Sequence, residues 1–196
     1  MIHQFFELAS RSIVALCIFA ILVSIAVNFL EAKKDKPKKE RRSIVATGTM
    51  MLFFIAFYFL IKLRIGYFDL PFIWIRIPLV LFGLAIFILG AYVNVKGRLL
   101  LGGNWADQIK IYRDHTFISN GVYGIVRHPH YTSLIWMFYA ASIIYTNYAA
   151  FLANTLIFIP FMYYRAKQEE QLLRKQFKGY LHYSKKVGMF FPRIVK

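Results

Sequence analysis

Five long apolar runs constrain the fold of this chain more than any other feature. A helix that crosses a bilayer needs roughly 20 mostly apolar residues. Of the 196 residues 59% are hydrophobic, whereas a soluble domain has roughly 45–50%. The sequence therefore predicts an all-α integral membrane protein with five transmembrane helices in one domain, residues 1–196. The runs cover about residues 10–30, 44–61, 72–95, 131–145 and 149–164.

The runs divide unevenly along the chain. Three of them lie in residues 1–95, and two lie in residues 96–196, where most of the polar residues that could carry chemistry are found. Only Thr146-Asn147-Tyr148 separates the fourth run from the fifth. A connection this short predicts an antiparallel helical hairpin.

Basic residues predict the orientation in the membrane. The formal net charge is +16, and most of the 25 lysines and arginines fall in residues 31–42, 96–127 and 165–196. With five spans these stretches share one side, which the positive-inside rule makes cytosolic, with the N-terminus outside. This rule explains the charge more simply than nucleic-acid binding, so we expect membrane lipids and no nucleic acid as partners. The basic linker is interpreted as a topology signal, with binding of anionic lipid as the alternative. The expected location is the cell membrane of a prokaryote or the endoplasmic reticulum of a eukaryote.

Polar residues gather in two of these cytosolic stretches. Residues 102–131 are rich in glycine and histidine and too long for an idle connector. The second stretch follows the fifth run, where Arg165 and Glu169 are four residues apart and share one face of a continuing helix. Gly179 is a plausible stop for that helix. Two adjacent acidic residues, Glu169 and Glu170, indicate a partner or a ligand.

The histidines admit more than one interpretation. A zinc site formed by His115, His128, His130 and His182 lacks the helical i, i+4 spacing and any cysteine ligand, so we expect no metal. Each histidine taken alone can be structural. The run from Arg127 to Tyr131 is different, because Pro129 is suited to a first helical turn, where free N–H groups favour polar ligands. No glycine-rich loop follows a strand, so a Rossmann-type domain is not expected.

Two motifs in these stretches resemble those of the isoprenylcysteine carboxyl methyltransferase family. Residues 121–131 read GVYGIVRHPHY, similar to the family's G-x-Y-x-x-x-R-H-P-x-Y motif. Residues 165–173 read RAKQEEQLL, similar to its R-x-x-x-E-E-x-x-L motif. The resemblance covers about residues 108–192. With five expected spans rather than the eight of eukaryotic members, the chain is similar to short prokaryotic or archaeal members.

The resemblance implies S-adenosylmethionine as methyl donor, with S-adenosylhomocysteine as product. It assigns Arg165 to catalysis and to the substrate carboxylate. His130 departs from the family pattern, in which the residue between Pro129 and Tyr131 is usually small. By position the cofactor residues are Gln108, His115, Thr116, Phe117, Ile118, Tyr123, His128, Pro129, His130, Tyr131 and Glu169.

The implied reaction is methylation of the carboxylate of a lipid-modified, isoprenylcysteine-type substrate that enters from the bilayer, giving a methyl ester. Two alternatives remain at this point. One is a phospholipid or lipid-amine N-methyltransferase, in which His128 or His130 would be the base. The other is a non-catalytic, lipid-binding membrane scaffold. The sequence specifies neither the native acceptor nor the oligomeric state.

Overall fold

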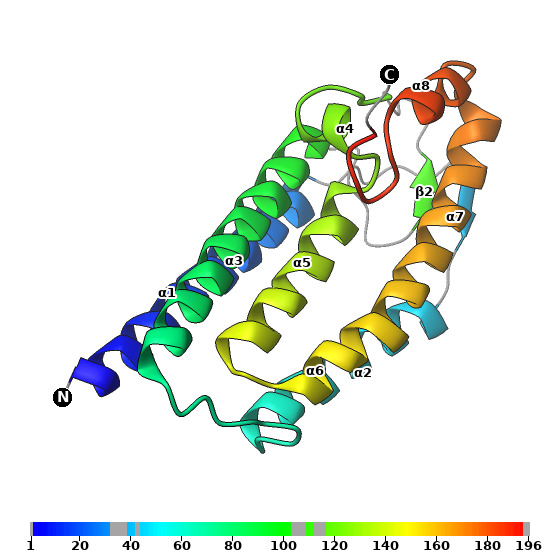
Figure 1. The fold of residues 1–196 in the computed structure, drawn as a ribbon. Helices are drawn as coiled ribbons and strands as arrows, with labels where there is room; N and C mark the ends of the chain where they lie inside the picture. The colour runs from blue at the N-terminus through cyan, green and yellow to red at the C-terminus, as the bar shows by residue number, and fades with distance from the viewer. Residues whose placement is uncertain (1, 32–38, 42–43, 103–108, 112–116, 194–196) are drawn as a thin grey trace.

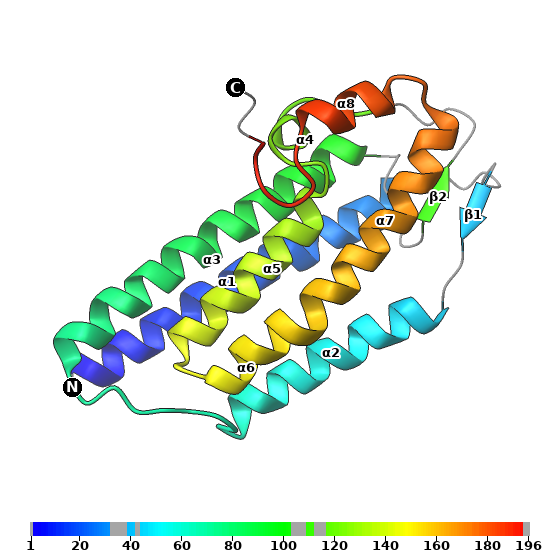
Figure 2. The same ribbon diagram turned by 45° about the vertical axis from the view of Figure 1, so that its right-hand side comes forward.

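All five apolar runs are helical in the computed structural model, which describes residues 2–31, 39–41, 44–102, 109–111 and 117–193. The helices run alternately up and down the bundle, and the C-terminus lies at the end opposite the N-terminus (Figures 1 and 2). The fourth and fifth runs form the predicted hairpin. The helices are α1 (Ile2–Glu31), α2 (Ile44–Lys62), α3 (Ile73–Leu101), α5 (Pro129–Ile144), and a continuous rod of α6 (Tyr148–Ala153), η2 (Asn154–Phe158) and α7 (Ile159–Gln176).

Two of these helices are long and apolar enough to cross a membrane. They are the segments Gln4–Leu30 and Ile73–Leu101. A third, Gly48–Lys62, is apolar but shorter. Length and composition thus support two spans among the described residues, and the five-span topology is taken up below as a proposal.

Glycines spaced seven residues apart bring α3 against α5. A Cβ atom on Gly83 would lie 2.8 Å from Ile144 Cγ1, and one on Gly90 would lie 2.6 Å from Met137 Cγ. Because seven residues are nearly two helical turns, these glycines share one face and let the two backbones approach closely. A buried hydrogen bond between Asn94 and Ser133, at 2.8 Å, lies within the same interface.

Aromatic rings join α2 to the hairpin. The Phe158 ring of η2 stacks on Phe53 at 4.7 Å and meets Phe138 of α5 edge-on at 4.8 Å. Phe158 is fully buried, as is Asn154, whose side chain donates to Ile135 O at 3.1 Å. The π-helical turn ends just before Pro160, whose nitrogen has no hydrogen for the regular helical ladder.

At the N-terminal end of the bundle the loop after α2 packs on the α5–α6 turn. Tyr67 forms an isolated antiparallel bridge with Asn147, whose side-chain Nδ2 donates to Leu60 O at 3.2 Å. Gly66 has φ +79°, and a Cβ atom there would lie 2.4 Å from Ala149 Cβ. Only glycine fits this close approach without strain.

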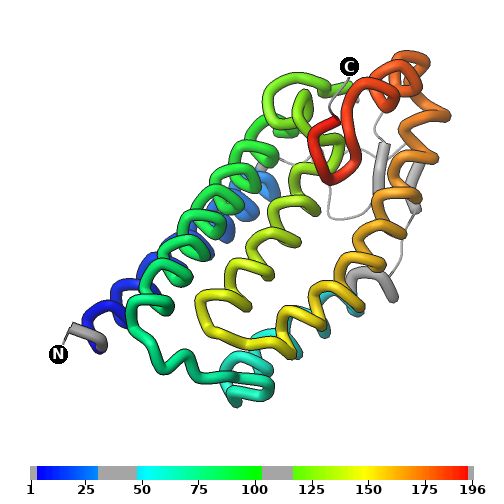
Figure 3. Tube along the Cα trace, viewed as in Figure 1, coloured from blue at the N-terminus to red at the C-terminus, as the bar shows by residue number. Residues whose placement is uncertain are grey.

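At the C-terminal end a short strap, Val187–Phe190, lies against the chain that leads into α5 (Figure 3). Gly188 O accepts from Arg127 N at 2.8 Å, and Met189 O accepts from His128 N at 3.2 Å. The Arg127 side chain reinforces this contact by donating to Ser184 O at 2.9 Å and to Val187 O. The strap follows α8 (Tyr180–Lys186), and α4 (Val122–Ile125) precedes Arg127.

Arg127 also ties this end to α7. Its Nε and Nη2 atoms each lie 2.8 Å from Glu170 Oε1, and only 2% of the Glu170 side chain is exposed. Burial alone would raise the pKa of Glu170, but hydrogen bonds from His128 and Arg127, together with their charges, lower it to about 2. The carboxylate therefore stays ionised at neutral pH.

Two expectations were wrong in detail. The all-helical prediction missed a two-stranded antiparallel pair, β1 (Lys39–Arg41) with β2 (Ile109–Ile111), which forms between two connecting segments. Gly179 does not stop α7, which ends at Gln176. It is instead the N-cap residue of α8, with an ordinary φ of −74°.

We expect Gly66→Ala to lower the stability of the bundle by about 2 kcal/mol or more, because the new methyl group meets Ala149 and the positive φ disfavours an L side chain. Gly48→Ala is the matched control, because a Cβ there meets nothing within 4 Å. Thermal unfolding in detergent measures both. Equal midpoints for the two variants would contradict the packing described for this loop.

We expect Glu170→Gln to destabilise the protein by about 3 kcal/mol, because it leaves the Arg127 guanidinium buried without its charge partner. Since the folded pKa of Glu170 lies below its ordinary 4.5, its contribution is fully present above pH 4.5 and is lost as the pH falls toward 2. The variant should lose that part of the acid dependence in a pH series of unfolding midpoints. Arg174→Gln, which removes a more exposed partner 3.4 Å from the same carboxylate, should change little.

Candidate active site

Four of the predicted site residues lie where the start of α5 meets the middle of α7, namely His128, Tyr131, Arg165 and Glu169. Pro129 is the first residue of α5, as its chemistry predicted. His128 is the N-cap residue, but its side chain makes no capping hydrogen bond. The imidazole is turned toward α7 instead. This local geometry points His128 and Tyr131 to the same neighbouring helix.

Glu169 is the residue of α7 that both of these side chains reach. The Tyr131 hydroxyl donates to Glu169 Oε2 at 3.2 Å, and His128 Nδ1 lies 3.4 Å from the same oxygen. About a third of the Glu169 side chain is exposed, 36%. Burial acts to raise the pKa of Glu169, but the hydrogen bond and charge of His128 lower it. The site therefore presents an ionised carboxylate with room for a further ligand.

His128 lies between two carboxylates. Its Nε2 atom is 3.2 Å from Glu170 Oε1, on the side of the ring opposite Glu169. Burial acts to lower the pKa of His128, but the hydrogen bonds and charges of Glu169 and Glu170 raise it. An imidazole can donate from both nitrogens only when it is protonated. This arrangement favours imidazolium and makes His128 a poor proton acceptor.

Arg165 lies one turn before Glu169 on the same helix, as the spacing predicted. It is 7% exposed, and its Nε and Nη1 atoms have no hydrogen-bond partner among the described residues. Leaving buried donors of a charged group unpaired is costly. A planar guanidinium with free donors is suited to a carboxylate.

Tyr123 of α4 and His130 of α5 face α3. The Tyr123 hydroxyl is 3.3 Å from His130 Nδ1 and 3.4 Å from Gly97 O. His130 Nε2 is buried and has no partner within the described part of the chain. The His130 ring packs closely on Gly97, where a Cβ atom would lie 3.1 Å from its Cε1. A larger residue at either position would separate α3 from α5.

The other predicted cofactor residues divide into two groups. Phe117 is packed among rings, stacked on Phe177 at 5.7 Å and edge-on to Tyr183 at 5.0 Å, and its neighbour Ile118 is half-buried. Gln108, His115 and Thr116 lie outside the described residues. Among the residues that are described, no group of three or more His, Cys, Asp or Glu side chains is placed to hold a metal ion.

Sequence reasoning missed Arg127 and Glu170 as site residues. Both stand directly beside residues that it selected, in the R-H-P and E-E motifs. The pairing of an arginine before one helix with the second glutamate of another was the available signal. It becomes specific only once the fold brings the two helices together.

Comparison with known proteins finds sequences and a structure that are similar to this part of the chain. Residues 83–175 match the model of the isoprenylcysteine carboxyl methyltransferase family. Protein-S-isoprenylcysteine O-methyltransferase B of Arabidopsis thaliana is 31% identical over 115 residues, which is 57% of this chain and 58% of that protein. A probable protein-S-isoprenylcysteine O-methyltransferase of Oryza sativa subsp. indica is 30% identical over 115 residues, covering 57% of this chain and 60% of the relative.

A solved structure is also similar to this chain. It is a structure of the eukaryotic intramembrane Ras methyltransferase, an isoprenylcysteine carboxyl methyltransferase. The two are 29% identical with a TM-score of 0.55, over 76% of this chain and 52% of that one. The match thus spans a little over half the length of the known relatives, and it contains both motifs of the site. Through this segment the chain is similar to the isoprenylcysteine carboxyl methyltransferase family.

Proposed function

We propose that this protein transfers a methyl group from S-adenosylmethionine to the carboxylate of a lipid-modified, isoprenylcysteine-type substrate at the membrane. The observation that carries the proposal is Arg165, a buried guanidinium with two donor atoms that no described residue pairs. A carboxylate is the ligand that satisfies such a fork. The family match and the names of its members support the same chemistry.

The charges around Arg165 favour an anionic acceptor over an amine. With His128 protonated, Glu169 and Glu170 are balanced by His128 and Arg127, which contact them. Arg165 is then the charge left uncompensated. An ammonium group bound beside it would add a second unpaired cation, whereas a carboxylate removes the imbalance.

The cofactor assignment rests on Glu169. Its partly exposed, ionised carboxylate can accept hydrogen bonds from hydroxyl or ammonium groups, and Tyr131 and His128 hold it in place. These features fit S-adenosylmethionine, which supplies an electrophilic methyl group on a positively charged sulfur.

The proposed reaction does not require the protein to remove a proton from the acceptor. The acceptor carboxylate has an ordinary pKa near 4 and is ionised at neutral pH, so it attacks without a general base. Arg165 binds and orients it, and must leave one oxygen free for attack. Burial of Arg165 excludes water from that contact. Holding two reactants in alignment can supply roughly 7–11 kcal/mol of the barrier reduction.

A membrane setting follows from the substrate. We infer five spans, with the C-terminal end of the bundle in the cytosol, because both basic connecting segments and the C-terminal region belong to that end. The acceptor's lipid then reaches the site sideways from the bilayer, while the soluble donor enters from the cytosol.

The deciding experiment incubates purified protein in lipid vesicles with methyl-labelled donor and either a prenylcysteine or an aminophospholipid. We expect label in a base-labile methyl ester of the prenylcysteine. A base-stable N-methyl product would favour the amine reaction instead. Failure of well-folded protein to bind S-adenosylhomocysteine in a calorimetric titration would favour the scaffold role.

We expect Arg165→Ala to leave S-adenosylhomocysteine affinity unchanged and to lower turnover by about 100-fold, because it removes the group that holds the reacting carboxylate. Calorimetry and the label-transfer assay measure the two quantities separately. Lys167→Ala, two residues along and exposed, is the matched control and should keep both. Loss of cofactor binding in a well-folded Arg165→Ala protein would reassign Arg165 to the donor.

We expect Glu169→Ala to weaken S-adenosylhomocysteine binding by about 10-fold or more, since hydrogen bonds to a charged group are each worth roughly 1.5–3 kcal/mol. The neighbouring exposed Gln171→Ala should bind as the parent does. Dissociation constants of S-adenosylhomocysteine, measured by calorimetry for both variants, test this prediction. Unchanged affinity in the Glu169 variant would remove this residue from the cofactor site.

A further inference from the structure

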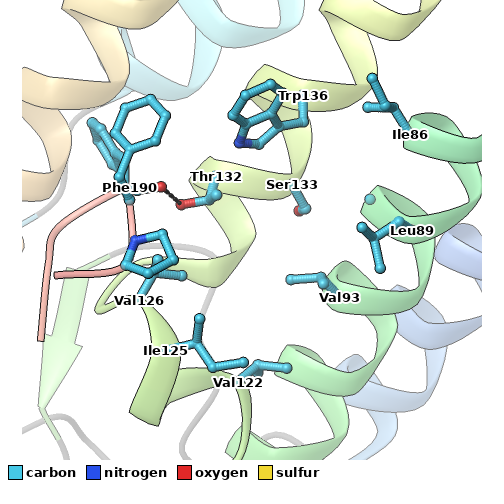
Figure 4. A pocket seen from close by; sticks show the side chains of 13 residues that line it. Ile86, Leu89, Val93, Val122, Ile125, Val126, Thr132, Ser133, Trp136 and Phe190 are labelled. Carbon is cyan, nitrogen blue, oxygen red and sulfur yellow. Dashed lines mark hydrogen bonds between the residues drawn. The ribbon is translucent and has the colours of Figure 1, made fainter. Parts of the chain in front are cut away.

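An apolar groove between α3 and α5 lies apart from the candidate active site (Figure 4). Its volume is about 340 Å³. Leu89 and Val93 of α3 form one wall, Ile125 of α4 and Trp136 of α5 form others, and Phe190 of the strap lies across from α3. We refer to it as the α3–α5 groove.

The two hydroxyl groups that line the groove are already hydrogen-bonded within the protein. Ser133 Oγ donates to His130 O at 2.8 Å and accepts from Asn94 Nδ2 at 2.8 Å. Thr132 Oγ1 donates to Phe190 O at 3.4 Å, the contact drawn in Figure 4. The other lining side chains are apolar, apart from the indole N–H of Trp136. Such a surface selects a hydrocarbon occupant, because a polar one would lose its hydration without replacement.

The mouth of the groove is continuous with the lipid-facing surface. Leu89, Ile125 and Phe191 are 62%, 57% and 63% exposed, and Phe82 and Ile88 of α3 are also exposed. An apolar patch of this kind marks an interaction surface. Given the membrane setting proposed above, the occupant enters sideways from the bilayer.

The groove is not lined by His128, Tyr131, Arg165 or Glu169, although its lining residue Phe190 meets the His128 ring edge-on at 6.2 Å. His128 and Tyr131 point to α7, whereas Thr132, Ser133 and Trp136 line a different face of the same helix. In our proposed function the acceptor's carboxylate is bound at Arg165, and its lipid reaches that site from the bilayer. The groove therefore calls for a different hydrocarbon chain.

Two basic residues, Lys96 and Arg193, lie near the end of the groove that is closest to the C-terminal end of the bundle. Lys96 follows Leu89 by seven residues, and so lies two turns further along the same face of α3. It is exposed and forms no ion pair with any described residue. Arg193 directly follows the groove residue Pro192 and is also exposed. No acidic residue lines the groove.

From this arrangement we propose that the α3–α5 groove binds one acyl chain of an anionic phospholipid, whose headgroup lies against Lys96 and Arg193. The lipid is a bound partner of the fold and not the methyl acceptor. The proposal rests on the membrane setting and not on methyl transfer, so the two can fail separately.

Fluorescence of Trp136 can test the proposal directly, because bromine atoms on an acyl chain quench a neighbouring indole. Replacing Trp74 and Trp105 by Phe leaves Trp136 as the only emitter. This protein is placed in phosphatidylcholine vesicles that contain increasing fractions of brominated phosphatidylglycerol or brominated phosphatidylcholine. We expect half-maximal quenching at about a 5-fold lower fraction of the anionic lipid, from about 1 kcal/mol for one lysine near the surface.

Lys96→Gln in the same background should weaken that preference without changing the fold, since it alters an exposed side chain. Lys175→Gln, exposed on α7, is the matched control and should keep the preference. Val93→Phe, which fills the groove, should lower quenching by both lipids. Equal quenching by the two lipids in the parent, or a preference that Lys96→Gln leaves unchanged, would overturn the proposal. So would protection of Trp136 by an added prenylcysteine, which would assign the groove to the acceptor.

Discussion

The packing of the C-terminal end of the protein depends on the contacts of the buried Glu170 carboxylate. This carboxylate accepts hydrogen bonds from Arg127 and His128, which precede α5, and so fixes α7 against the start of α5. Arg127 extends the contact to the strap through Ser184 O and Val187 O. Three segments far apart in sequence thus meet at one ion pair, which is costly to bury unless every partner is present.

The candidate site inherits its geometry from this contact. His128 is held by Glu170 on one side and so presents its other nitrogen to Glu169. The close approach of α3, made possible by Gly83, Gly90 and Gly97, fixes the other side of α5. Helix α5 is therefore held on one side by close packing against the glycines of α3 and on the other by the charge pairs with α7.

Local sequence patterns predicted the helices but not the tertiary contacts between them. The five apolar runs, the helix start at Pro129 and the shared face of Arg165 and Glu169 follow from helical periodicity and backbone chemistry, which neighbouring residues determine. The strap and the pairing of Arg127 with Glu170 join residues more than forty positions apart. Gly179 was misread for the same reason, since α7 ends three residues earlier and packing places the glycine at the start of α8.

The balance of buried charge indicates which ligand Arg165 binds. Glu169 and Glu170 face His128 and Arg127, so these four groups compensate one another within contact distance. Arg165, on the same helix, has no such partner among the described residues. In a medium of low dielectric an unpaired cation attracts an anion strongly and repels a second cation. A carboxylate bound at Arg165 would neutralise that charge and so permit a positively charged methyl donor to bind beside it. Binding of the acceptor and binding of the donor are on this account electrostatically coupled.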